Sequence, residues 1–133
     1  MSITTADIRR IMYGILSPLG LPVHYKEDIP KGEITGERII IVTSGEGYGK
    51  IWATCIVTIS ICVPDPTPNV ADLTRLSYYE NEALKMFKDG IVGDYKGDNY
   101  VISLQKNGIE EDRQMRCHYV NLKLSFEVLN VKQ

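Results

Sequence analysis

The sequence lacks the features that mark secreted, membrane and metal-binding proteins. Its 133 residues include only three cysteines and two histidines, and no CxxC pair occurs, so neither a disulfide framework nor a cysteine-based metal site is expected. The opening residues lack the basic and apolar regions of a signal peptide. No uninterrupted apolar run is long enough for a membrane helix. These absences predict a cytosolic protein with three reduced, largely structural thiols.

The sequence also has no large excess of either acidic or basic residues. The formal net charge is only -2 and the charged and apolar fractions are ordinary, which gives no reason to expect a membrane or a sequence-specific nucleic acid as partner. A chain of this length is expected to form one domain, spanning residues 1–133, and to bury about two-thirds of its unfolded surface. No cofactor is expected.

The strongest pattern is a strict alternation over residues 51–63. One set of alternate residues is apolar: Ile51, Ala53, Cys55, Val57, Ile59, Ile61 and Val63. The other set is mostly small and hydroxylated, with Trp52 among its members. Because strand side chains alternate between the two faces of a sheet, the pattern predicts a long central strand. One face packs on the core and the other is partly polar.

Two helices are predicted on either side of this strand. Apolar residues recur at helical spacing from Ile8 to Leu19, Thr4 or Thr5 can cap the start, and Pro18 interrupts the pattern. A second helix is predicted over residues 70–88, with Asn69 or Asp72 as its cap.

Further strands and loops complete the predicted order. The remaining segments are an extended piece at 23–25, a polar loop at 26–37, a strand at 38–43, a hairpin of 91–95 with 100–104, a charged loop at 105–115 and a last strand at 116–131. The last strand resembles residues 51–63 in length, so we expect the two to pair. The fold class is therefore α+β, with both helices covering one face of a largely antiparallel or mixed sheet.

The candidate catalytic and phosphate-binding motifs lack the spacing or geometry that such sites require. The glycines of residues 45–50 lack P-loop spacing, and a strand follows them where a helix is needed. Cys117 and His118 are adjacent on a strand and so point to opposite faces. His118 could still meet Cys55 or Cys62, but a structural histidine is the stronger interpretation. No catalytic or metal-binding residue is predicted, and the chain is not expected to be an enzyme.

The charged segments are better interpreted as contact surfaces. Acidic residues at 27–28 and 110–112 lack the spacing of a calcium loop, and basic residues lie beside them. An exposed tryptophan can anchor an interface. The candidate interface residues are Trp52, Lys26, Glu27, Asp28, Lys31, Lys106, Glu110, Glu111, Asp112 and Arg113.

The layout resembles the phage tail-terminator and tail-completion family, which includes prophage minor tail components. The likeness extends over nearly the whole chain. It is carried by Ile8–Leu19, Val23–Tyr25, Ile29–Gly32, Arg38–Val42, the long strand ending in Pro64-Asp-Pro, Leu73, Leu76 and Leu84 of the second helix, and His118–Val128.

The resemblance implies a structural protein that forms a ring, commonly a hexamer, at the end of the tail tube. Its partners would be further copies of itself, the tail-tube protein and head–tail connector proteins. Its location would be the bacterial cytoplasm during assembly and then the virion tail. The alternatives are a head–tail adaptor protein or a small ligand-binding or interaction module.

Overall fold

The computed structural model describes residues 3–29, 35–44 and 54–129. Within these ranges the helices are α1 (Thr5–Leu16) and α2 (Leu73–Phe87), with short 3₁₀ helices η1 (Ser17–Leu19) and η2 (Lys26–Asp28). The strands are β1 (Val23–Tyr25), β2 (Arg38–Ser44), β3 (Thr54–Pro64), β4 (Ile91–Tyr95), β5 (Asp98–Asp112) and β6 (Cys117–Val128). None of the described helices is long and apolar enough to cross a membrane.

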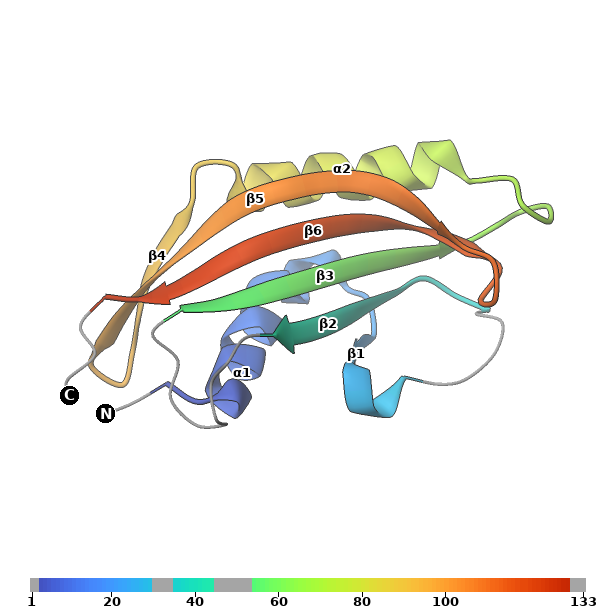
Figure 1. Cartoon of the computed structure of the whole chain (residues 1–133). Coiled ribbons are helices and arrows are strands. Elements are labelled where there is room, and N and C mark those ends of the chain that lie inside the picture. The colour runs from blue at the N-terminus through green and yellow to red at the C-terminus, as the bar shows by residue number, and fades with distance from the viewer. Residues whose placement is uncertain (1–2, 30–34, 45–53, 130–133) are drawn as a thin grey trace.

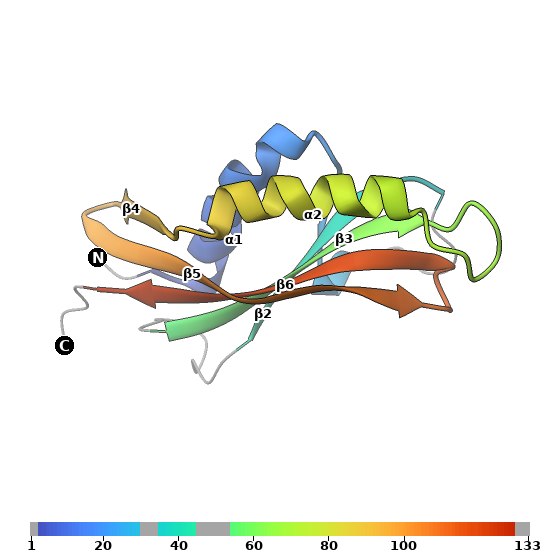
Figure 2. The ribbon, with the colours of Figure 1, turned by 90° about the horizontal axis from the view of Figure 1, so that it is seen from above.

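The strands form one mixed sheet in the order β1-β2-β3-β6-β5-β4. Only the short β1 is parallel to its neighbour, β2, and the other pairings are antiparallel. Figure 1 shows the strands curving across the molecule, and Figure 2 shows α1 and α2 on the same side of the sheet. The predicted α+β fold, with two helices on one face, is therefore confirmed.

The core lies between the helices and the sheet, and the alternation in β3 builds its centre. The alternate residues Cys55, Val57, Ile59, Ile61 and Val63 are buried in it, as predicted. The expected pairing with the last strand is also confirmed, because β6 pairs with the whole of β3, from Thr54 opposite Glu127 to Pro64 opposite Cys117. Full burial of such side chains stabilises the fold by about 1.5–3 kcal/mol each.

Helix α1 starts where the sequence predicts and ends earlier. Thr4 is its N-cap and forms a capping box with Asp7, whose side chain bonds the Thr4 backbone at 3.0 Å. The predicted stripe continues to Leu19, but the α-helix ends at Leu16 and η1 carries the chain on to Gly20, which has φ of 69°. Pro18 explains the change, because proline cannot continue the helical hydrogen bonding.

Helix α2 begins three residues later than predicted. Asp72 caps it by accepting the Arg75 N–H at 3.2 Å, whereas Val70 lies in a turn with its N–H bonded to the Thr67 carbonyl at 2.9 Å. Asn69, the other predicted cap, has φ of 64°, a left-handed conformation that suits a turn.

The predicted charged loop at residues 105–115 is wrong. Strand β5 continues through most of it to Asp112 and pairs with β6 as far as that residue, with a register shift between Leu104 and Lys106. The predicted four-residue hairpin turn at 96–99 is also shorter, because Asp98 and Asn99 already belong to β5. Lys96 and Gly97 have φ of 52° and 90°, as a tight two-residue hairpin turn requires.

Glu37, just before β2, joins the start of that strand to α2. Its carboxylate accepts hydrogen bonds from Arg75 Nε and Nη2, each at 2.8 Å, and from the Tyr79 hydroxyl at 2.5 Å. The Arg75 hydrogen bonds hold the pKa of Glu37 below its usual value, and burial is the main cause that raises the pKa of Tyr79 to about 12.

This contact predicts a pH-dependent loss of stability. A carboxyl whose pKa is lowered by folding stabilises the protein above its unfolded pKa, and that contribution disappears as the pH falls through the folded pKa. We expect Glu37→Gln to lower the free energy of unfolding by about 1 kcal/mol at pH 7, and the difference from wild type to shrink towards pH 3. Urea unfolding at both pH values measures it. Glu82→Gln, which breaks the exposed pair with Lys85, is the control, and an unchanged difference at pH 3 would contradict the account.

Candidate functional site

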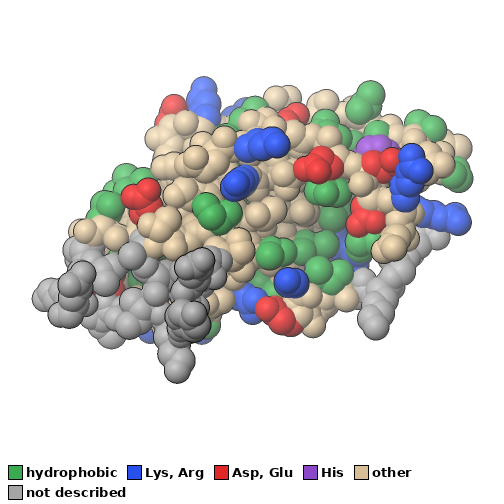
Figure 3. Space-filling view, in the orientation of Figure 1, with side chains coloured by type: hydrophobic (Ala, Val, Ile, Leu, Met, Phe, Trp, Pro, Cys, Tyr) green, Lys and Arg blue, Asp and Glu red, His purple; other side chains and the backbone are tan. Residues whose placement is uncertain are grey.

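The face of the sheet opposite the helices is the broadest candidate surface. Residues of β3 and β6 that alternate with the core positions point to it, including Ile56, Thr58 and Ser60 of β3 and Asn121 and Lys123 of β6. We call it the open face. Figure 3 looks onto it and shows hydrophobic side chains over its right half, with acidic and basic side chains crowded at the right end. Its mixture of apolar, hydroxyl and charged groups agrees with the partly polar face predicted from residues 51–63.

A small apolar cluster occupies one end of the open face. Ile40, Cys62 and Cys117 are buried in it, and four partly buried side chains pack around them: Ile29, Val42, Met115 and Tyr119. Arg38 is also buried here, and its Nη2 donates to the Met115 sulfur at 3.8 Å. The cluster gives this face a local apolar centre that is separate from the main core.

Two cysteines meet in this cluster. A hydrogen bond between the Cys62 and Cys117 thiols is the main cause that lowers the pKa of Cys62, with help from the positive charge of Arg38. The same hydrogen bond raises the pKa of Cys117. All three cysteines are free and buried, as expected for structural thiols, and burial raises the pKa of Cys55 to about 11.

In the β3–β6 register His118 faces the opposite side of the sheet from Cys62, and it lies eight residues along β6 from the position opposite Cys55. Its Nδ1 is 2.7 Å from Oδ1 of Asp65, whose side chain is only 3 % exposed, and its Nε2 is 4.0 Å from Glu111. His118 is opposite Val63 of the core face, whereas Cys62 belongs to the open face and Cys55 is opposite Phe126. The ring therefore joins the segment after β3 to the end of β5, as the structural interpretation predicts.

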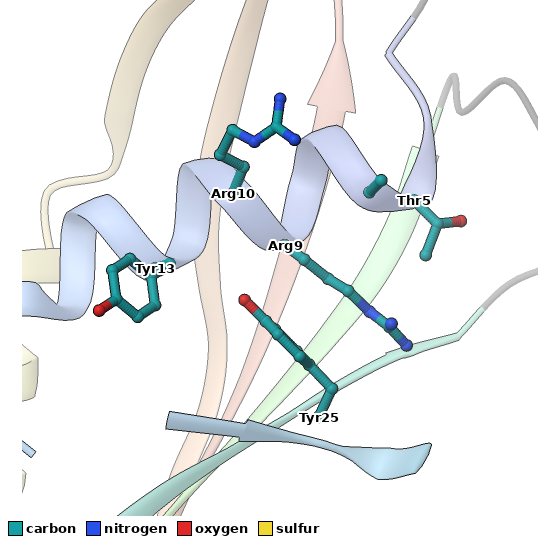
Figure 4. Close-up of a pocket in the computed structure, with 6 residues that line it drawn as sticks. Thr5, Arg9, Arg10, Tyr13 and Tyr25 are labelled. Carbon is teal, nitrogen blue, oxygen red and sulfur yellow. The ribbon is translucent and has the colours of Figure 1, made fainter. Parts of the chain in front are cut away.

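A cavity of about 500 Å³ lies beside α1, lined by Thr5, Ala6, Arg9, Arg10, Tyr13 and Tyr25. Figure 4 shows Arg9 extending along the Tyr25 ring while Arg10 points elsewhere. The Arg9 guanidinium is 4.8 Å from the ring centroid, and its Nη2 contacts both carboxylate oxygens of Glu27 at 2.6 and 2.7 Å. Arg10 bonds the Tyr95 hydroxyl at 3.3 Å. No sequence pattern predicts this cavity, because its residues come together only when β1 packs beside α1.

Some of the candidate interface residues at 26–31 have partners within the chain. The Arg9 hydrogen bond lowers the pKa of the exposed Glu27, and Asp28 accepts the Tyr25 N–H at 2.7 Å. Both acidic groups thus have partners within the chain, while the Lys26 side chain is exposed. Lys31 and Trp52 lie outside the described residues.

The second predicted interface segment belongs to β5 and the turn that follows it. Lys106, Glu110 and Glu111 are exposed strand residues, Asp112 accepts the Met115 N–H at 3.1 Å, and Arg113 pairs with Glu111 at 3.1 Å. No group of three or more His, Cys, Asp or Glu side chains that could hold a metal ion is found in the described part of the chain.

Comparison with known proteins supports the fold. No protein-family model matches the sequence, and a search of curated proteins found no match. A solved structure whose name carries no functional description is similar, with a TM-score of 0.57 and 15 % sequence identity over 95 % of this chain and 96 % of that one. At this level of identity the likeness shows the α+β fold alone.

Proposed function

We propose that this chain is a structural phage or prophage protein, a tail terminator or tail-completion protein that forms a ring where the tail tube meets the head. The open face is the observation that carries the proposal. Val42 and Ile56 are half-buried on a sheet face that neither α1 nor α2 covers, beside the buried cluster around Ile40. An apolar group rimmed by polar residues is the usual composition of a protein–protein interface.

A ring needs two different surfaces that meet head to tail and close on themselves. The open face supplies one broad surface. The exposed Lys26 and its neighbours lie beside β1, at one end of the strand order, and supply a charged second surface. The candidate residue Trp52, which alternates with the core set in the sequence, adds to the open face in this proposal.

The proposed partners follow from this role. They are further copies of the chain, in a ring that is commonly a hexamer in this class, together with the tail-tube protein and the head–tail connector. The proposed location is the bacterial cytoplasm during assembly and the virion tail afterwards. The role requires no catalysis, cofactor or metal. A head–tail adaptor protein is the close alternative within the same class.

Assembly measurements test the proposal. We expect size-exclusion chromatography with light scattering, followed by negative-stain imaging, to show a ring either alone or after addition of tail-tube protein. Ile56→Glu puts a charge in the middle of the open face and should abolish the ring while the circular-dichroism spectrum stays unchanged. Trp52→Ala should weaken it. Tyr78→Glu, on the exposed outer side of α2, is the control and should leave the ring intact. If tail-tube protein induces no ring, the proposal fails.

The cavity beside α1 favours a second candidate, a small ligand-binding module. Its two arginines and two tyrosines, on α1 and β1, could hold a small anion with a planar group. A ligand screen by nuclear magnetic resonance separates the two candidates, since shifts confined to Arg9, Arg10 and Tyr25 in a chain that never forms rings would favour ligand binding.

A further inference from the structure

The outer half of β5 has a free edge. Strand β4 pairs with β5 only from Asp98 to Ile102, whereas β6 pairs with the other edge of β5 as far as Asp112. Within the described residues, no strand lies beside the segment from Ser103 to Asp112 on its outer side, and Figure 1 shows β5 running well past β4. An edge of this length presents a row of backbone N–H and C=O groups that can pair with another strand.

The charges along this edge lack partners on the open face. Lys106 lies opposite Lys123 in the β5–β6 register, and like charges in opposite positions destabilise a sheet. Among the described residues neither lysine forms an ion pair, and neither does Glu110. A neighbour that placed a carboxylate beside Lys106 and a cation beside Glu110 would remove this imbalance.

The flank of α2 above the edge is also available for contact. Asn107 of β5 donates to Glu80 of α2 at 2.9 Å, which fixes the side of the helix that faces β5. Leu73 and Leu84 lie on the same flank as Glu80, because residues seven apart, and residues four apart, share a helix face. Leu73 is 63 % exposed. The Asn107–Glu80 hydrogen bond therefore joins this flank of α2 to the strand edge.

We propose that two copies of this chain associate through antiparallel pairing of their β5 edges about Gly108. This register puts Lys106 of each copy opposite Glu110 of the other, on the open face, and Asn107 opposite Ile109 on the helix face. The two-fold symmetry repeats each contact, the two sheets join into one, and the α2 flanks meet above the junction. The sequence Lys-Asn-Gly-Ile-Glu at 106–110 has opposite charges at its ends, so it complements itself in the antiparallel direction.

Neighbouring registers are less well matched. A two-fold axis at Lys106 or at Glu110 places identical charges opposite each other, which is destabilising. An axis at Ile109 places Lys106 opposite Asp112, whose Oδ1 already accepts the Met115 N–H at 3.1 Å. The Gly108 register is the one that pairs the two unpartnered charges of β5, Lys106 and Glu110.

This contact goes beyond the proposed ring and uses the backbone edge of β5 with the charges that flank it, away from the middle of the open face around Ile56. A two-fold contact cannot close a ring by itself, because it joins the same patch of each subunit. The ring contact of the proposed function lies on the open face around Ile56 and beside β1, so the two contacts are separable by mutation.

Charge reversal tests the pairing in the full chain. By sedimentation equilibrium we expect Lys106→Glu and Glu110→Lys each to weaken the dimer at least about tenfold in Kd, because each makes two like-charge pairs per dimer. The double variant, with the charges exchanged, should recover the wild-type Kd to within about threefold. Lys85→Glu and Glu127→Lys, on exposed residues away from this edge, are the matched controls and should leave the Kd unchanged.

The same measurements in the Ile56→Glu background separate this proposal from the ring. Dimers that persist without rings, and that Lys106→Glu removes, support the β5 contact even where the proposed function fails. Amide hydrogen exchange should show protection of residues 105–111 that rises with protein concentration. A chain that stays monomeric at about 1 mM would overturn the proposal. A dimer whose Kd is unchanged by both Lys106→Glu and Glu110→Lys would also overturn it. If the double variant Lys106→Glu/Asp112→Lys recovers the wild-type Kd and Lys106→Glu/Glu110→Lys does not, the Gly108 register is wrong.

Discussion

Replacing Phe126 with alanine is expected to lower the free energy of unfolding by about 3–5 kcal/mol. Phe126 lies on β6 in the centre of the sheet, is fully buried, and stacks on Tyr100 with ring centroids 5.0 Å apart and planes 15° from parallel. Truncation removes the buried ring and leaves a cavity that β3 and β5, hydrogen-bonded on either side, cannot close. Urea unfolding followed by circular dichroism measures the loss.

Two control variants make the Phe126 result specific. Phe126→Leu keeps most of the buried volume and is expected to lose less than about half as much stability as the alanine variant. Tyr13→Ala removes an aromatic ring that is 54 % exposed and should change stability by less than about 0.5 kcal/mol. A Phe126→Ala variant as stable as Tyr13→Ala would contradict the position of this residue in the core.

The two long central strands were predictable because one face of each is buried. In β3 and β6 the core positions are apolar at a strict period of two, so the hydrophobic pattern identifies both the strands and their inward faces. The capping residue of α1 was predictable for a similar local reason, because Thr4 and Asp7 stand three residues apart, as a capping box requires.

The outer half of β5 was not predictable from the same signal. From Gln105 to Glu111 the segment has exposed polar residues on both faces, so no alternation distinguishes it from a loop. It is a strand because β6 supplies a paired backbone partner, which is a property of the partner and not of its own residues. The register shift at Lys106 also changes which alternate residues face the helices.

The meeting of Cys62 with Cys117 depends on register, which the sequence left open. Both cysteines lie on long strands that were expected to pair, and the observed register, with Cys62 opposite Tyr119, brings Cys117 next to Cys62 on the open face. A shift of one residue would put the two thiols on opposite faces. The short β1 was detectable only as an extended piece, because three residues carry no periodic signal of parallel pairing with β2.

Gly93 of β4 is expected to tolerate no side chain. It lies opposite Tyr100 of β5, and a Cβ at Gly93 would overlap the Tyr100 ring and hydroxyl. The ring covers the glycine, an arrangement that stabilises glycine in an edge strand. Since Tyr100 is also stacked on Phe126, it cannot move away freely. We expect Gly93→Ala to lower the free energy of unfolding by about 1–3 kcal/mol, measured by urea unfolding.

A double-mutant cycle shows whether Tyr100 is the cause. In a Tyr100→Ala background, Gly93→Ala should lower the free energy of unfolding by less than about 0.5 kcal/mol, because the overlapping ring is gone. Additive effects of the two substitutions would contradict the account. The variant also bears on assembly. Strand β4 covers the β5 edge from Asp98 to Ile102, so loosening β4 lengthens the edge that a second copy can pair with. Gly93→Ala should therefore strengthen association through β5 while it weakens the fold, and Lys106→Glu in the same chain should cancel that gain.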